Sequence, residues 1–185
     1  MTRLPFAKLR QRLHGFIRHR GGVSAVEFAL LLPIMVTLYL GCVEVGTGMS
    51  VQFKTTLAAR TVADLASQYK SINNATMTDI LGAATAVLTP YSGAVRVVVS
   101  EVTTDAQGRA TVTWSDANAN ATARAVGSSV TLPTNVGGAS ITIIWGEVTY
   151  PYNPQFGWVL TGTINMYQDI FFYPRLSTTV TRVNS

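Results

Sequence analysis

The longest apolar run in the sequence lies near its N-terminus. Val26 to Val45 is a stretch of 20 residues whose only charged side chains are Glu27 and Glu44, close to its two ends. A helix needs about 20 apolar residues to cross a bilayer. We therefore expect a transmembrane helix over residues 23–49. The two acids lie only about 25 Å apart along such a helix, less than the thickness of the hydrocarbon core, so one of them should sit slightly inside the lipid.

Hydrophobic positions keep a helical spacing beyond this run. Steps of four and three residues form one seam, which predicts that the helix extends from near Ser24 to near Lys70. Packing of the seam against the chain's own sheet is favoured over pairing with another helix, because the exported body needs a core. The seam consists of Val51, Thr55, Ala58, Val62, Leu65, Tyr69 and Ile72.

The remaining pattern predicts a second helix and then strands. The segment 77–89 has a helical apolar face, and the period changes to two over 95–99 and 110–114, on either side of a hairpin turn. Residues 140–150 form the most apolar strand, and the polar, alternating segment 175–183 suits an edge strand. Residues 156–172 fit either a helix or an aromatic loop. Helices beside an antiparallel sheet give an α+β fold.

Charge divides the chain into a basic arm and a balanced body. Six of the 14 Lys and Arg residues fall in the first 20 positions, whereas the chain from Val23 onward carries eight basic and nine acidic residues. The arm favours a cytoplasmic N-terminus and an exported body. We expect a leader over 1–22 and an exported α+β domain over 50–185. The body lacks the basic face that a nucleic-acid-binding protein needs.

Cysteine and histidine usage argues against an enzyme. The single Cys42 lies in the apolar run, and His14 and His19 both fall in the basic arm. The body then has no histidine for a catalytic triad or a metal site, and its acids are scattered. We expect no catalytic residues, no metal, no cofactor and no small-molecule substrate. A secreted hydrolase is the most distant alternative.

The junction at Gly22 and Val23 admits several interpretations. A signal anchor whose Glu27 snorkels to the interface is the simplest. A secretory signal peptide and a lipoprotein signal at Cys42 fit less well. In a further interpretation, the segment resembles the signal of type IV prepilins, in which a basic leader ends in glycine and a glutamate occupies the fifth mature position. A cut after Gly22 makes Val23 the first residue and Glu27 the fifth.

That spacing has a physical rationale. Cleavage would create an α-amino group at Val23, mostly cationic with an ordinary pKa near 8. Glu27 follows it by four residues, so both groups share one side of a helix. An unpaired carboxylate in lipid costs on the order of 2.5–3.5 kcal/mol, which favours assembly with a helix that supplies a partner. Pro33 removes one helix hydrogen bond and is expected to bend the helix, unless it is only a tolerated membrane proline.

The run "RGGVSAVEFALLLPIMVTLYLGCVEVG" (residues 20–46) resembles the N-terminus of TadE-like proteins of the Tad, or Flp-type, pilus system. Segments 58–68, 112–117, 147–154 and 171–177 are also similar to parts of TadE/TadG-like members. The resemblance implies a bitopic pseudopilin or minor pilin of the bacterial inner membrane, cut by a prepilin peptidase. Its implied partners are other pilin-like subunits and the pilus assembly platform, and its implied role is pilus assembly and surface adhesion. Phe28 and the long exported body disfavour a major filament subunit.

Two further points stay open at this stage. The C-terminal half is rich in aromatic residues, and Tyr150, Tyr152, Phe156 and Trp158 are a candidate interaction surface, although packing in the core explains them more simply. The alternative function is an uncleaved, TadG-like binding module of the periplasm, in which the helix serves only as a tether.

Overall fold

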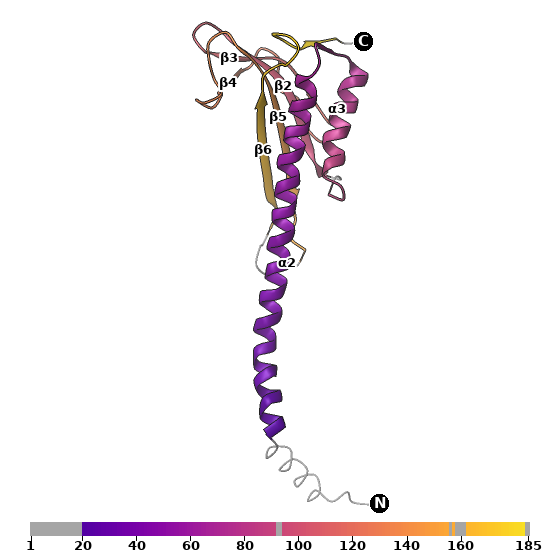
Figure 1. Cartoon of the computed structure of the whole chain (residues 1–185), viewed down its shortest axis with the longest axis vertical. Coiled ribbons are helices and arrows are strands. Elements are labelled where there is room, and N and C mark those ends of the chain that lie inside the picture. The colour runs from indigo at the N-terminus through magenta and orange to yellow at the C-terminus, as the bar shows by residue number, and fades with distance from the viewer. Residues whose placement is uncertain (1–19, 92–93, 156, 158–161, 184–185) are drawn as a thin grey trace, which may run out of the picture. The chain divides into compact units, whose positions relative to one another are not determined.

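The computed structural model describes residues 20–91, 94–155, 157 and 162–183 (Figure 1). The chain divides into two compact units, an N-terminal unit that ends at Val45 and a C-terminal unit that begins at Gly46. Residues 1–19 of the basic arm lie outside the described residues. The fold class is α+β, as the sequence predicts.

The first described helix, α2, comprises Arg20–Ser67 and contains the whole apolar run. It ends three residues before the predicted Lys70, because Gln68 and Tyr69 donate backbone hydrogen bonds to carbonyls three residues earlier, which closes the last turn. Tyr69 therefore leaves the helix and is 41% exposed. The prediction that Tyr69 belongs to the buried seam is wrong. Ile72 is buried, but it lies in a strand.

The second helix, α3, comprises Asn74–Val87 and begins earlier than predicted. Asn73 is its N-cap, and the Asn73 side chain accepts a hydrogen bond of 2.8 Å from the Thr76 backbone N–H. This satisfies one of the free donors at the helix start. The polar residues that precede the predicted helix therefore include its N-cap, Asn73. Met77, Ile80 and Ala84 face the core, which confirms the predicted apolar face.

The main sheet has five strands in the order β4-β3-β2-β5-β6, and all its pairs are antiparallel. The predicted hairpin and the predicted apolar strand are confirmed as β2–β3 and β5. The strands are β2 (Arg96–Thr104), β3 (Ala110–Ala117), β4 (Ser129–Val130), β5 (Thr142–Tyr152) and β6 (Ile164–Phe172).

The expectation of a helix or an aromatic loop over 156–172 is wrong for residues 164–172, which form strand β6. Ile170 and Phe172 pack against the core beneath the helices, whereas Phe171 stacks on Trp145 with ring centroids 5.4 Å apart. The end of the strand, residues 170–172, therefore contributes apolar side chains to both faces of the sheet. These three consecutive apolar residues interrupt the polar–apolar alternation that identifies a strand in a sequence.

The C-terminal segment forms a separate two-stranded sheet in which β1 (Ser71–Ile72) pairs in parallel with β7 (Thr181–Arg182). The prediction of an edge strand over 175–183 is wrong, because Val180 is drawn into the core. Its backbone N–H donates to the Glu101 carboxylate at 2.5 Å, and its carbonyl accepts from Trp114 Nε1 at 2.7 Å.

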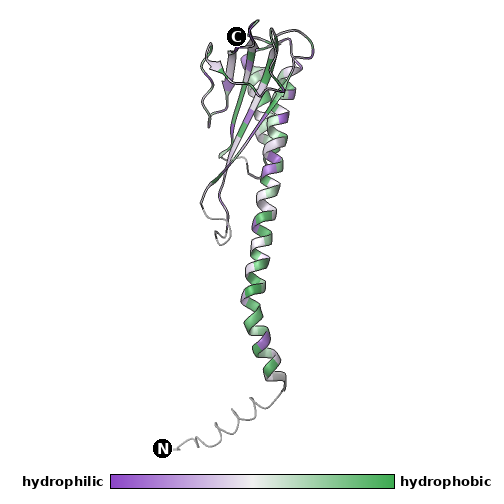
Figure 2. Ribbon diagram, turned by 90° about the vertical axis from the view of Figure 1, so that its left-hand side faces the viewer, coloured by the Kyte–Doolittle hydropathy of each residue, from purple (hydrophilic) through white to green (hydrophobic). Residues whose placement is uncertain are grey.

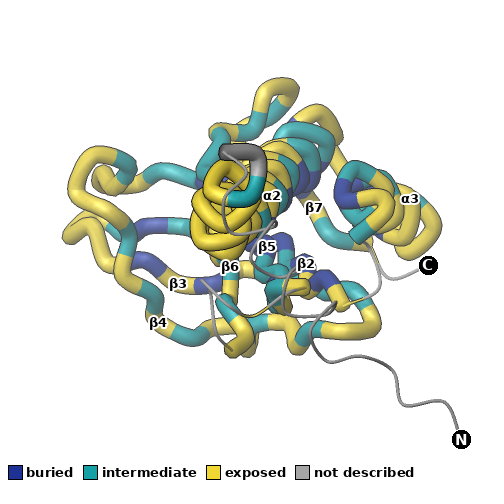
Figure 3. The backbone as a smooth tube through the Cα atoms, turned by 90° about the horizontal axis from the view of Figure 1, so that it is seen from below, coloured by how far each residue is buried: buried dark blue, intermediate teal, exposed yellow. Residues whose placement is uncertain are grey.

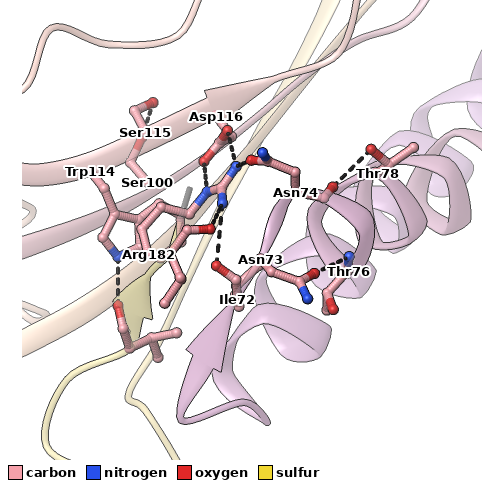
Figure 4. Close-up of polar contacts among 12 residues, drawn as sticks. Ile72, Asn73, Asn74, Thr76, Thr78, Ser100, Trp114, Ser115, Asp116 and Arg182 are labelled. Atoms are coloured by element: carbon pink, nitrogen blue, oxygen red, sulfur yellow. Dashed lines mark hydrogen bonds and ion pairs between the residues drawn. The ribbon is translucent and has the colours of Figure 1, made fainter. Parts of the chain in front are cut away.

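Arg182 joins this small sheet to the body, as Figure 4 shows. Its guanidinium donates to both carboxylate oxygens of Asp116, at 2.8 and 3.2 Å, and to Asn74 Oδ1 at 2.7 Å. One side chain thereby connects β7, β3 and the start of α3.

Helices α2 and α3 lie on the same side of the main sheet (Figure 3). Small side chains let α2 come close to β5: the Ala59 carbonyl and the side chains of Val62 and Ala63 all lie within 3 Å of the point where a Cβ would sit on Gly146. The predicted packing of the seam on the chain's own sheet is confirmed. The core includes Ala58, Ala59, Val62, Ala63, Ala66, Val97, Val99, Ile144 and Val148.

Candidate membrane and assembly site

The N-terminal half of α2 consists mostly of hydrophobic residues (Figure 2). By length and composition, α2 is the one helix among the described residues that could cross a membrane, and none of its most apolar window is buried within the protein. Soluble proteins rarely expose such a surface. Its large exposed residues are Val23, Val26, Phe28, Leu30, Leu31, Leu32, Ile34, Met35, Val36, Leu38, Tyr39, Val43 and Val45.

Glu27 is the acid that a neighbour could reach on this segment. Its side chain is exposed, whereas Glu44, at the other end of the segment, is only 2% exposed. No described residue forms an ion pair with Glu27. A carboxylate in this setting favours any partner that brings a positive charge or hydrogen-bond donors into lipid.

Gly22 and Val23, the residues of the predicted cut, lie in the first turn of α2, which begins at Arg20. Val23 is 54% exposed, and Glu27 follows it by one helical turn, on the same side of the helix. The glycine pair before Val23 is a poor helix former. Cleavage of the Gly22–Val23 peptide bond stays a prediction.

Pro33 lies inside α2, which continues through it. The ring removes the N–H that would otherwise donate to the Ala29 carbonyl. The Pro33 carbonyl itself accepts a hydrogen bond of 2.8 Å from Thr37 Oγ1, in addition to its place in the helix ladder. The bend at Pro33 stays a prediction.

The four aromatic residues of the candidate interaction surface divide into two groups. Tyr152 is 4% exposed and lies 3.6 Å from the position of a Cβ on Gly48. Tyr150 packs against the core, and its ring meets Tyr91 edge-to-face at 6.2 Å. These positions favour packing for both tyrosines. Phe156 and Trp158 lie outside the described residues, so the interaction surface remains a prediction.

A polar cluster on the sheet face opposite the helices was not predicted. Arg124 donates two hydrogen bonds to the Glu147 carboxylate, at 2.6 and 2.7 Å, and Tyr167 OH donates a third at 2.9 Å. Arg124 also lies over the ring of Trp145 at 4.0 Å. Burial, and then the hydrogen bond to Glu147, raises the pKa of Tyr167. The hydrogen bond to Glu147 likewise raises the pKa of Arg124.

This cluster holds the loop before β4 against the sheet and contains no activated nucleophile. The carboxylate of Glu147 already has three donors, and its charge is balanced by Arg124. Among the described residues, no group of three His, Cys, Asp or Glu side chains could hold a metal ion. No sequence motif links Arg124 and Glu147, which are 23 positions apart.

Comparison with known families agrees with the N-terminal pattern. The sequence profile of the family described as TadE-like protein matches residues 22–64, a segment that contains Gly22, Val23, Glu27 and Pro33. The match confirms the family resemblance indicated by the sequence. Comparisons with curated proteins and with solved structures found no significant match.

Proposed function

We propose that this chain is a pseudopilin or minor pilin that supports pilus assembly and surface adhesion, because residues 22–64 match the family of TadE-like proteins. Residues 23–49 span the bacterial inner membrane with the leader, 1–22, in the cytoplasm, and residues 50–185 are exported. A prepilin peptidase cuts between Gly22 and Val23. The role is structural, with neither a catalytic site nor a cofactor.

The observation that carries this proposal is the exposed Glu27 on an apolar helical segment, four residues after Val23 and without an ion pair among the described residues. The α-amino group created at Val23 would have an ordinary pKa of about 8 and would be mostly protonated at neutral pH. Its charge complements the Glu27 carboxylate of the same helix or of a neighbouring pilin-like helix.

The energy involved is large enough to direct assembly. A lone carboxylate at the bilayer centre costs on the order of 2.5–3.5 kcal/mol on insertion scales, which is an upper bound for Glu27, one turn from the end of the proposed span. If a neighbouring amine removes that cost, the equilibrium between separate and docked helices shifts by at most about two orders of magnitude, because 1.4 kcal/mol corresponds to a factor of ten. Glu27 would thus fix the register in which the helix joins an assembly, and the expected bend at Pro33 would shape the same surface.

Substitutions at Glu27 test the docking role. We expect Glu27→Gln and Glu27→Ala to reduce pili per cell at least tenfold, counted by electron microscopy, with protein levels in the membrane unchanged by immunoblot. Leu38→Ala is the matched control, because Leu38 is 65% exposed on the same apolar segment and carries no charge. Normal piliation of the Glu27→Gln strain would contradict the docking role and would favour an uncleaved, TadG-like tethered module.

A further inference from the structure

Strand β6 forms an open edge of the main sheet. In the order β4-β3-β2-β5-β6 it pairs only with β5, over nine residue pairs without a shift in register. In an antiparallel sheet, every second residue of an edge strand points its N–H and C=O away from its neighbour. In the described part of the chain no backbone group bonds to this free edge, and the one side-chain hydrogen bond to the β6 backbone runs from Gln168 Nε2 to the Tyr167 carbonyl at 2.8 Å.

The free edge of β6 lacks the features that protect most edge strands. Such strands are usually short, bulged or interrupted by lysine or proline. Strand β6 has nine residues, none of them lysine or proline, whereas β4 at the opposite edge has only two residues. Asn165 is exposed, and Tyr167 is 46% exposed. A long, regular and accessible edge of this kind is a template for one more strand.

Asp169 leaves an uncompensated negative charge on this strand. It lies directly opposite Glu147 in the register of β5 and β6, an arrangement in which like charges repel. Arg124 pairs with Glu147, and within the described residues Asp169 forms no ion pair. A basic side chain on an added strand would lie beside Asp169 on the same face of the sheet and would balance this charge.

Strand β6 runs in the same direction as the exported part of α2 (Figure 1). Side-chain atoms of Tyr152 and Met166 lie within 4 Å of the position of a Cβ on Gly48, whereas a Cβ on Gly146 would meet Ala59. Strand β5 therefore runs antiparallel to α2. Because β6 is antiparallel to β5, it runs along α2 in the direction away from the proposed membrane span.

This direction argues against a second copy of the chain as the added strand. Symmetric pairing of β6 with itself is antiparallel and uses a two-fold axis perpendicular to the strands. That axis would point the two α2 helices in opposite directions, which two copies anchored in one membrane do not allow. The other edge strand of the main sheet, β4, is too short to serve. This step rests on the proposed membrane span, whereas the free edge itself does not.

We propose that the free edge of β6 docks an extended segment of a different exported polypeptide, which adds to the sheet as an antiparallel strand. Only an extended backbone can satisfy the row of free N–H and C=O groups, so lipid does not compete for it. The segment carries apolar side chains at alternate positions, which continue the row of Met166, Ile170 and Phe172 on the helix side. On the other face it places a lysine or arginine beside Asp169.

Amide hydrogen exchange of the purified full chain in detergent micelles tests this docking. The probe is a synthetic nonapeptide in which threonine and valine alternate, with lysine in place of the central threonine. We expect this peptide to slow exchange over residues 164–172 at least fivefold and to leave β2, which has a strand on each side, unchanged. The same peptide with every amide N-methylated is the matched control, because it keeps the side chains but has no backbone donors, and it should give no protection.

Charge reversal separates docking from a purely structural role of Asp169. Asp169→Lys should lose the protection given by the lysine peptide and gain protection from a peptide with a central glutamate. Asp169→Asn, which keeps the size of the side chain, should weaken binding of the lysine peptide at least threefold, so the charge is tested even if the reversal unfolds the chain.

Glu27→Gln should leave peptide binding unchanged, so failure of this inference and failure of the proposed function are distinct outcomes. Equal protection by the N-methylated peptide, or no protection of residues 164–172 by the lysine peptide, would overturn the docking site. Protection of β6 that grows with protein concentration in the absence of peptide would show pairing between copies and would also overturn it.

Discussion

Substitution of Gly146 by alanine is expected to disturb the packing of α2 on the sheet and to lower the stability of the fold. The added Cβ would lie 2.8 Å from the Ala59 carbonyl oxygen, 2.8 Å from Val62 Cγ1 and 2.9 Å from Ala63 Cβ. One of these atoms belongs to the backbone and the other two to short side chains, so none can move aside without moving the helix. Overpacking of a core costs about 1–3 kcal/mol, and three simultaneous contacts favour the upper end of that range.

The conformational preference of a strand for alanine over glycine partly offsets this destabilisation. Alanine is favoured over glycine inside a strand by roughly 0.5–1 kcal/mol, so the net destabilisation of Gly146→Ala is about 2 kcal/mol. For a domain of this size, that corresponds to a fall in Tm of about 4–8 °C. The measurement is thermal unfolding of the full chain in detergent micelles, followed by circular dichroism.

Gly82→Ala is the matched control for this substitution. Gly82 lies in α3, and a Cβ there would meet no atom within 4 Å, so this change should raise the stability by about 1 kcal/mol through helix propensity alone. The two variants should therefore shift Tm in opposite directions. An unchanged or higher Tm for Gly146→Ala, together with a higher Tm for Gly82→Ala, would refute the close packing of α2 on β5.

Two further predictions concern the C-terminal segment. Arg182→Ala should destabilise the fold by about 3 kcal/mol, because it leaves the partly buried Asp116 without its ion pair, and faster amide hydrogen exchange in β7 should report the change. Arg109→Ala, which breaks an exposed ion pair, should change Tm little. Burial raises the pKa of Glu101, against a smaller opposing effect of the Val180 hydrogen bond. The folded state then binds more protons than the unfolded state between about pH 4.3 and the raised pKa, so stability is greatest below this window and falls as pH rises through it. Glu101→Gln should remove this fall and raise Tm at pH 7, and a variant that keeps the wild-type profile of Tm against pH would contradict it.

The elements predicted from the sequence are those whose own residues carry a clear pattern. The apolar run and its seam identify α2, and the alternation of apolar residues identifies β2 and β3. The concentration of apolar residues over 140–150 identifies β5. The TadE-like pattern could be recognised for the same reason, because Gly22, Val23 and Glu27 lie within one short segment. The cut at Gly22 and Val23 and the docking role of Glu27 stay predictions.

The features that were missed depend on contacts between distant residues. Residues 170–172, at the end of strand β6, are apolar on both faces of the sheet, so the alternation of polar and apolar residues stops there. The β1–β7 pair joins Ser71 to Thr181, and Arg182 joins Asp116 to Asn74, contacts that no local pattern encodes. The need for glycine at position 146 arises only from the helix that crosses it. These are properties of the packed protein, not of any single segment.

The central claim is that the working protein begins at Val23, where its new α-amino group can pair with Glu27. The most direct test is the intact mass of the protein purified from native membranes, with sequencing of its N-terminal peptide. The expected chain starts at Val23 and lacks the first 22 residues. A chain that retains its basic leader in cells making functional pili would contradict the claim.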